Sequence, residues 1–287
     1  MLKKIQYRVR RYFSFFLKQQ AVIYNHKIFL PTLHPLKNIM DLHSNYDRFI
    51  GKLATVIDAD TIAIDVGANI GDSSIRMALC RSDILIYAYE PSIGFYGYAQ
   101  ENIKRLGIKN IRLFNQAVGS EPYIFLDEKN GTGSNLQELS GNNTMKIRAN
   151  RLDECTAGLK KKVKLIKIDT DGWDWDVLNS GMELIDRDRP IIFFELQIDS
   201  NKVLCEYSST LKTLFSLGYT FFVFDNFGNY IFDLNDAFIL EEKLSYLLNP
   251  STPSSERRIP YFDLCGVSTY QDKNLVTILM KNYCDKH

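Results

Sequence analysis

Residues 61–71 read TIAIDVGANIG, an apolar run followed by a turn that contains two glycines. The run is rich in β-branched residues and stops at Gly67, which is typical of a buried strand that ends at a tight turn. Glycine tolerates positive φ and lets the backbone approach a ligand closely. Asp72 can then cap an amphipathic helix that runs to Arg81. The stretch therefore predicts a strand, a turn and a helix in succession.

The alternation of short apolar runs with amphipathic stretches continues along the chain. We predict strands at residues 61–66, 83–90, 111–115, 163–169, 189–195, 219–225, 230–233 and 274–280, with helices at 72–81, 92–106, 208–217 and 236–248. Residues 116–162 are less regular, and we expect an insertion or loop with a candidate strand at 123–127 and a glycine-rich stretch, NGTGSN. The pattern favours an α/β fold, a doubly wound and mostly parallel sheet of seven or so strands with helices on both faces.

Composition places the chain among globular proteins. It has 287 residues, of which 45% are hydrophobic and 24% charged, so a disordered chain or a fibrous repeat is excluded. Residues 1–40 contain eight basic residues and no acid, although the net charge of the whole chain is only +1. We expect a basic N-terminal arm, residues 1–45, before one domain, residues 46–287.

The arm has apolar residues at helical spacing between residues 2 and 17, with a basic opposite face. We expect it to pack on the acidic body of its own chain or of a second subunit, with peripheral membrane contact as the alternative. No apolar run approaches the roughly 20 residues of a membrane-spanning helix. The five cysteines are dispersed and form no C-x-x-C pair, which favours neither zinc nor disulfides. We expect a cytoplasmic protein that the arm can bring to the inner face of a membrane.

Polar residues end the first five predicted strands, where a doubly wound sheet binds its ligands. In chain order they are Asp65, Glu90, Asn115, Asp169 and Glu195. A dinucleotide loop of the type G-x-G-x-x-G would need glycine where Asn69 and Asp72 stand, so a pyrophosphate is disfavoured. Glu90 lies at the spacing of an acid that binds a ribose diol. An adenosine compound with a positive charge and no phosphate suits this acidic edge, and S-adenosylmethionine has those features.

Several motifs in this order resemble those of the FkbM-type S-adenosylmethionine-dependent methyltransferases. They are IDVGANIG at 64–71, YEP at 89–91, ENI at 101–103, RLD at 151–153, KIDTDG at 167–172 and RPIIFFE at 189–195. The resemblance covers residues 62–196 and implies a Rossmann-like class I methyltransferase fold. It also implies an oxygen acceptor on a sugar or glycan, as in surface polysaccharide or secondary-metabolite biosynthesis.

The resemblance implies roles for residues of the turn and of the strand ends. The residues it places around the cofactor are Asp65, Gly67, Asn69, Gly71 and Glu90, with Asn115 at the neighbouring strand end. An oxygen acceptor must lose a proton, which calls for a base near the methyl group. Asp169 is the first candidate for that base, with Asp171 just beyond it and Glu195 at the next strand end. The family often has glutamate where this chain has Asp171.

Other interpretations of the same residues stay open at this point. Each acid could instead hold a loop or pair with a basic residue. Five acids, Asp169, Asp171, Asp174, Asp176 and Glu195, could hold a divalent ion, yet no complete ligand set is recognisable and no metal is predicted. The rival functions are a nucleic-acid methyltransferase and a non-catalytic module that binds an adenosine-type ligand. We expect no nucleic-acid partner, because DTDG follows the fourth strand in place of the signature of amino-group methylation. One of the two tryptophans of the acidic loop, Trp173 and Trp175, could stack on a sugar ring, and His43 could fold over the site.

Overall fold

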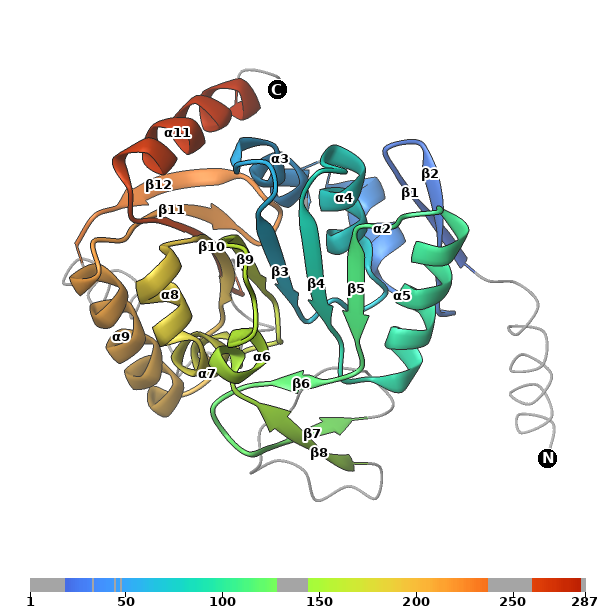
Figure 1. Cartoon of the computed structure of the whole chain (residues 1–287), viewed down its shortest axis with the longest axis horizontal. Helices are drawn as coiled ribbons and strands as arrows, with labels where there is room; N and C mark the ends of the chain where they lie inside the picture. Colours follow the sequence, from blue (N-terminus) through green and yellow to red (C-terminus); the bar gives the residue numbers. More distant parts are fainter. Residues whose placement is uncertain are drawn as a thin grey trace.

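A computed structural model of the chain describes residues 19–32, 34–43, 45–46, 48–127, 144–236 and 260–284. These residues form one large sheet with helices on both faces, a small second sheet beside it and an N-terminal hairpin (Figure 1). The α/β class and the mostly parallel sheet expected from the sequence are confirmed, although the sheet has eight strands and not seven.

The order of the strands creates a switch point in the middle of the large sheet. Its order is β12-β11-β13-β10-β9-β3-β4-β5. The bounds are β3 Ile62–Val66, β4 Leu85–Tyr89, β5 Ile111–Phe114, β9 Val163–Ile168, β10 Ile191–Leu196, β11 Thr220–Asp225, β12 Tyr230–Leu234 and β13 Phe262–Val267. From β3 the chain moves outward to β4 and β5, and then returns to the other side of β3 with β9 and β10, all parallel. Ligands of such sheets bind where the order reverses, here between β3 and β9.

Both faces of the sheet are covered, which explains why the central strands are almost continuously apolar. Ile64 and Val66 of β3 point into a core formed with one set of helices, while Ala63 points into a second core on the other face. The first set is α6 Leu152–Thr156, α7 Asp174–Ser180, α8 Met182–Asp188 and α9 Asn201–Ser216. The second is α3 Arg48–Val56, α4 Asp72–Cys80 and α11 Tyr270–Cys284, with α5 Ile93–Arg105 next to β5.

The N-terminal part of the described chain packs on the body. Strands β1 Gln19–Ile23 and β2 His26–Leu30 form a hairpin, and helix α2 Leu36–Leu42 follows it. Ile23 and Ile28 are fully buried in a cluster that includes Ile70 and Ile75, which belong to the turn after β3 and to α4. The hairpin therefore stabilises the back of that turn. The arm helix expected over residues 2–17 lies outside the described residues and stays a prediction, as does the domain boundary at residue 46.

The irregular region after β5 forms a small sheet of its own. Strands β6 Ala117–Val118, β7 Tyr123–Asp127 and β8 Thr144–Asn150 lie in the order β6-β8-β7. The candidate strand at 123–127 is confirmed as β7. Figure 1 shows this small sheet beyond the arrowheads of β3, β4 and β5, so it lies at the carboxyl edge of the large sheet. The glycine-rich stretch NGTGSN lies outside the described residues.

One predicted strand is wrong. Residues 274–280 are part of helix α11, in which Asp272, Val276 and Met280 are buried at a spacing of four. Thr269 and Asp272 hydrogen-bond each other at its start, Asp272 N–H donating to the threonine oxygen over 3.0 Å. A short apolar run does not distinguish a strand from a buried helix. The missing antiparallel strand is β13, between β10 and β11.

Two other helix predictions differ in outcome. Helix α9 begins at Asn201, earlier than the predicted 208, because Ser200 caps it by accepting from the N–H of Val203. The helix expected at 236–248 lies outside the described residues. Within the described part of the chain, no helix is both long and apolar enough to cross a membrane.

Candidate functional site

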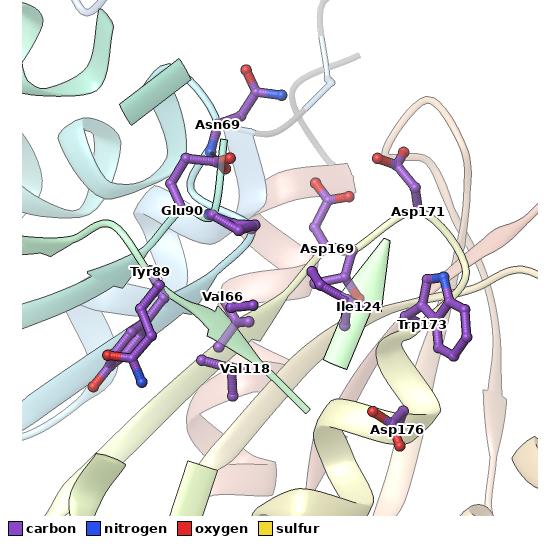
Figure 2. Close-up of a pocket in the computed structure, with 15 residues that line it drawn as sticks. Val66, Asn69, Tyr89, Glu90, Val118, Ile124, Asp169, Asp171, Trp173 and Asp176 are labelled. Carbon is purple, nitrogen blue, oxygen red and sulfur yellow. Dashed lines mark hydrogen bonds between the residues drawn. The ribbon is translucent and has the colours of Figure 1, made fainter. Parts of the chain in front are cut away.

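A pocket lies at the switch point, between the carboxyl ends of β3, β4 and β9. Its volume is about 670 Å³, a figure that includes the open space at its mouth. Its lining comes from the turn after β3, the end of β4, the small sheet and the loop after β9. Figure 2 shows Asn69 and Glu90 on one side, with Asp169, Asp171 and Trp173 on the other. The carboxyl edge of the sheet, where the sequence predicts a ligand, therefore contains a pocket.

The turn after β3 needs its glycines. Gly67 has φ +81° and Gly71 has φ +86°, and Asn69 between them also has positive φ, +49°. A Cβ atom on Gly67 would overlap the carbonyl oxygen of Asp169, and one on Gly71 would lie 3.2 Å from the Cβ of Ala99. Gly67 lines the pocket, whereas Gly71 begins α4 against α5. Because of these glycines, the backbone of the turn lies close to the pocket and also packs against the backbone just after β9.

Asp65 stabilises this turn from the protein interior and does not line the pocket. It is fully buried, and its Oδ2 accepts hydrogen bonds from Ser73 (2.6 Å) and Ser74 (2.5 Å) at the start of α4. Its Oδ1 is 3.4 Å from Nζ of Lys167 in β9. Among the described residues, the contacts of this carboxylate tie β3, β9 and α4 together. Its predicted cofactor role stays a prediction.

Glu90 lies at the end of β4 with both carboxylate oxygens facing backbone N–H groups. Asn69 N–H donates to Oε2 over 2.7 Å and Ser92 N–H donates to Oε1 over 2.8 Å. The side chain is 4% exposed, and desolvation raises the pKa of its carboxyl to about 7 in spite of these two hydrogen bonds. Each carboxylate oxygen has two lone pairs, so each can accept one more donor from a ligand. Two neighbouring ribose hydroxyls fit that requirement.

Asn115 follows β5 and is exposed. Its Nδ2 donates to the carbonyl oxygens of Glu90 (2.9 Å) and Pro91 (3.0 Å). It therefore fixes the backbone beside Glu90, and the pocket is lined by the neighbouring Gln116 and Ala117. Its contribution to cofactor binding stays a prediction, and the geometry favours an indirect one.

The loop after β9 supplies two acids to the other side of the pocket. Oδ2 of Asp169 is 3.1 Å from Nζ of Lys167, which also neutralises Asp65. Asp171 has φ +51° and reaches the surface at the mouth of the pocket. Desolvation, and next the negative charges of Asp169 and Asp174, raise the pKa of Asp171 to about 7. A carboxyl that titrates near neutrality suits proton transfer.

Asp174 holds the shape of this loop. It is fully buried and accepts from the N–H of Thr170 (2.7 Å), from the Thr170 hydroxyl (2.5 Å) and from the N–H of Glu195 (2.8 Å). Desolvation, followed by the charge of Asp169, raises the pKa of Asp174 to about 7. Asp176 similarly accepts from the backbone and hydroxyl of Ser120, which attaches the small sheet to α7.

Glu195 is not among the residues that line the pocket. It is 8% exposed at the end of β10 and lies opposite Asp263 of β13. Desolvation, and then the charges of Asp169 and Asp174, raise the pKa of Glu195 well above its ordinary value. Within the described residues, no group of three or more acids, cysteines or histidines is arranged to hold a metal ion.

The structure adds residues that the sequence did not single out. Ile124 of β7 and Val118 of β6 line the pocket, and Lys167 carries the positive charge between the two acids. Trp173, which the sequence had already suggested for stacking, also lines it, and the ring of Trp175 is stacked with 6.0 Å between centroids. Nε2 of His34 lies 3.2 Å from Oδ1 of Asn69, whereas the candidate His43 stacks on Phe227 instead. Only Lys167 left a signal, a basic residue inside a buried strand.

Comparisons with known proteins agree with this geometry. A sequence model described as the methyltransferase FkbM domain matches residues 65–221. No curated protein matches the chain. With the observed sheet topology, the expected class, a Rossmann-like class I methyltransferase fold, is confirmed.

Among solved structures, three examples show the level of similarity. SMU.1697c, a putative methyltransferase from Streptococcus mutans in complex with SAH, has 10% identity over 78% of this chain and 96% of its own, with a TM-score of 0.45. Methyltransferase FkbM from Methylobacillus flagellatus KT has 12% identity over 80% and 53%, with a TM-score of 0.39. Precorrin-6y C5,15-methyltransferase from Geobacter metallireducens GS-15 has 12% identity over 77% and 87%, with a TM-score of 0.40.

Proposed function

The chain belongs to the FkbM family of S-adenosylmethionine-dependent methyltransferases, and we propose that it methylates a hydroxyl oxygen of a sugar or glycan-type acceptor. The observation that carries this proposal is the two-sided pocket. One side has a carboxylate that can accept two vicinal hydroxyls, and the other has acids beside an aromatic ring.

The residues on the first side fit the cofactor. The glycine turn brings backbone close to the ligand. Among the described residues each oxygen of Glu90 accepts one hydrogen bond, which leaves a lone pair on each for the ribose. The nearby acids disfavour a pyrophosphate and favour a positively charged ligand. When bound, S-adenosylmethionine would supply a methyl group attached to a sulfonium. The acceptor oxygen would bond to the methyl carbon, and the sulfur would leave as a neutral thioether.

The residues on the second side fit a hydroxyl acceptor. Because Lys167 is paired with Asp169 and holds its carboxylate in place, Asp169 serves best as a hydrogen-bond acceptor for the incoming hydroxyl. Asp171, with a pKa of about 7, takes the proton as the oxygen forms its bond to carbon. Trp173 offers a flat apolar face, which suits a sugar ring. The sequence favoured Asp169 as the base, whereas the ion pair between Asp169 and Lys167 favours Asp171.

Labelled-methyl transfer tests this proposal. The purified chain is incubated with methyl-labelled S-adenosylmethionine and with separated carbohydrate and nucleic-acid fractions of a cell extract. We expect label in the carbohydrate fraction, as an ether that survives mild base. Glu90→Ala should abolish the transfer, while Gly97→Ala, on the exposed side of α5, should not. Label in the nucleic-acid fraction, or in neither fraction despite cofactor binding, would contradict the proposal.

A further inference from the structure

His34 lies between β2 and α2, outside the segment that matches the family, and contacts the turn after β3. Its Nε2 is 3.2 Å from Oδ1 of Asn69. The half-buried ring also stands edge-on to Phe95 in α5, with 5.8 Å between ring centroids. These contacts flank Glu90, because Asn69 donates to one of its oxygens and Ser92, which caps α5, donates to the other.

The hydrogen bonds of His34 assign its tautomer. Leu36 N–H donates to Nδ1 over 3.3 Å, so Nδ1 must present its lone pair. Burial lowers the pKa of His34, which keeps the imidazole neutral at pH 7. A neutral imidazole has one N–H, and here it lies on Nε2. His34 is therefore the donor and Oδ1 of Asn69 the acceptor.

This donor selects one of the two orientations of the Asn69 amide. An asparagine amide has an acceptor on one side and a donor on the other, and a rotation of about 180° exchanges them. With Oδ1 held by His34, Nδ2 is the group left for a ligand, and Asn69 lines the pocket. Within the described part of the chain, Nδ2 donates to no protein acceptor. Figure 2 shows the backbone of Asn69 next to Glu90, with the side-chain amide extending away from that carboxylate.

We propose that His34 is a positioning residue for the cofactor: its Nε2–H fixes the Asn69 amide so that Nδ2 donates to the carboxylate of the methionine moiety. This rests on the proposed placement of S-adenosylmethionine in this pocket. Glu90, Asp169 and Asp171 accept hydrogen bonds and repel an anion, so a bound carboxylate needs neutral donors. Asn69 Nδ2 and the backbone N–H groups of the turn are donors of that kind.

The test compares two ligands on the full chain by calorimetric titration. S-adenosylhomocysteine has the amino-acid moiety, and 5′-methylthioadenosine keeps the adenosine but lacks it. His34→Leu should weaken S-adenosylhomocysteine binding about tenfold and leave 5′-methylthioadenosine unchanged. His34→Gln, whose amide can donate from a similar position, should restore most of the affinity. His43→Leu is the matched control, since His43 stacks on Phe227 and does not line the pocket.

A double-variant cycle separates positioning from general support of the fold. In an Asn69→Ala background, His34→Leu should change S-adenosylhomocysteine affinity less than about twofold. If the leucine variant does not fold, His34→Asn replaces it, because its shorter side chain keeps an acceptor near Nδ1 but does not reach Asn69. Equal loss for both ligands, or no loss for either, would overturn the role of His34. If the unmodified chain binds neither ligand, the proposed function itself fails.

Discussion

Replacing Glu90 with glutamine should remove a pH-dependent loss of stability and should weaken cofactor binding at pH 8. The folded chain raises the pKa of this carboxyl from 4.5 to about 7, so it binds the proton more tightly than the unfolded chain does. Between these two pH values the folded state therefore loses stability as pH rises. At about 1.4 kcal/mol per pKa unit, the loss is on the order of 3 kcal/mol for this 4% exposed side chain.

Glutamine cannot titrate, so the variant should lack this loss. Glutamine also turns an amide NH₂ toward one of the two backbone N–H groups at this site, at a cost of about 1–3 kcal/mol that does not depend on pH. The quantity to compare is therefore the difference in the free energy of unfolding between the two proteins, at pH 5 and at pH 8. Urea unfolding at pH 5 and pH 8, followed by circular dichroism, measures it. Other acids of the pocket are present in both proteins and cancel to first order.

We expect the free energy of unfolding of the unmodified chain, relative to Glu90→Gln, to fall by about 2–3 kcal/mol from pH 5 to pH 8. At pH 8 the variant should bind S-adenosylhomocysteine at least about tenfold more weakly, because it offers one acceptor oxygen where the carboxylate offers two. If the free energy of unfolding changed equally with pH in both proteins, the claim that Glu90 is a buried carboxyl with a raised pKa would be refuted. Unchanged affinity would refute its contact with the ribose.

Three further substitutions test the scaffold of the pocket by urea unfolding. Gly67→Ala should lower the free energy of unfolding by more than about 2 kcal/mol, because Gly67 has positive φ and an added Cβ would overlap a backbone carbonyl. The control, Gly97→Ala, should leave the free energy of unfolding unchanged or raise it. Equal effects of the two substitutions would contradict this prediction. Lys167→Met should cost about 3–5 kcal/mol, since a fully buried carboxylate loses its cation, while Lys161→Met, from an exposed ion pair, should cost less than about 1 kcal/mol. Asp174→Asn should cost about 1–3 kcal/mol, because an NH₂ group would face a backbone N–H, and a change within error would show that its three hydrogen bonds do not hold the loop.

Much of the central sheet could be predicted because its strands are short apolar runs that stop at glycine or an acid. That signal is local and gives β3, β4, β9 and β10 with small errors at their ends. The same signal failed at residues 274–280, where burial at a spacing of four shows a helix packed on the sheet. The sequence of β13 includes cysteine and glycine and does not stand out as a strand.

Residues of the candidate site could be predicted only where they lie at the carboxyl ends of parallel strands. Parallel strands place their carboxyl ends together, so Glu90 and Asp169 could be brought to one pocket from sequence alone. Glu195 also ends a strand, yet it is buried beside Asp263 and not in the pocket lining. His34 could not be found, because its contact with Asn69 spans 35 residues of chain and depends on how the hairpin packs.

The most direct test of the central claim is a crystal structure of the full chain soaked with S-adenosylhomocysteine. We predict that the two ribose hydroxyls will each lie within hydrogen-bond distance, about 2.5–3.0 Å, of a different carboxylate oxygen of Glu90. The sulfur should face Asp169 and Asp171 across the pocket. A pocket that stays empty at saturating ligand, or a ribose bound away from Glu90, would contradict the claim.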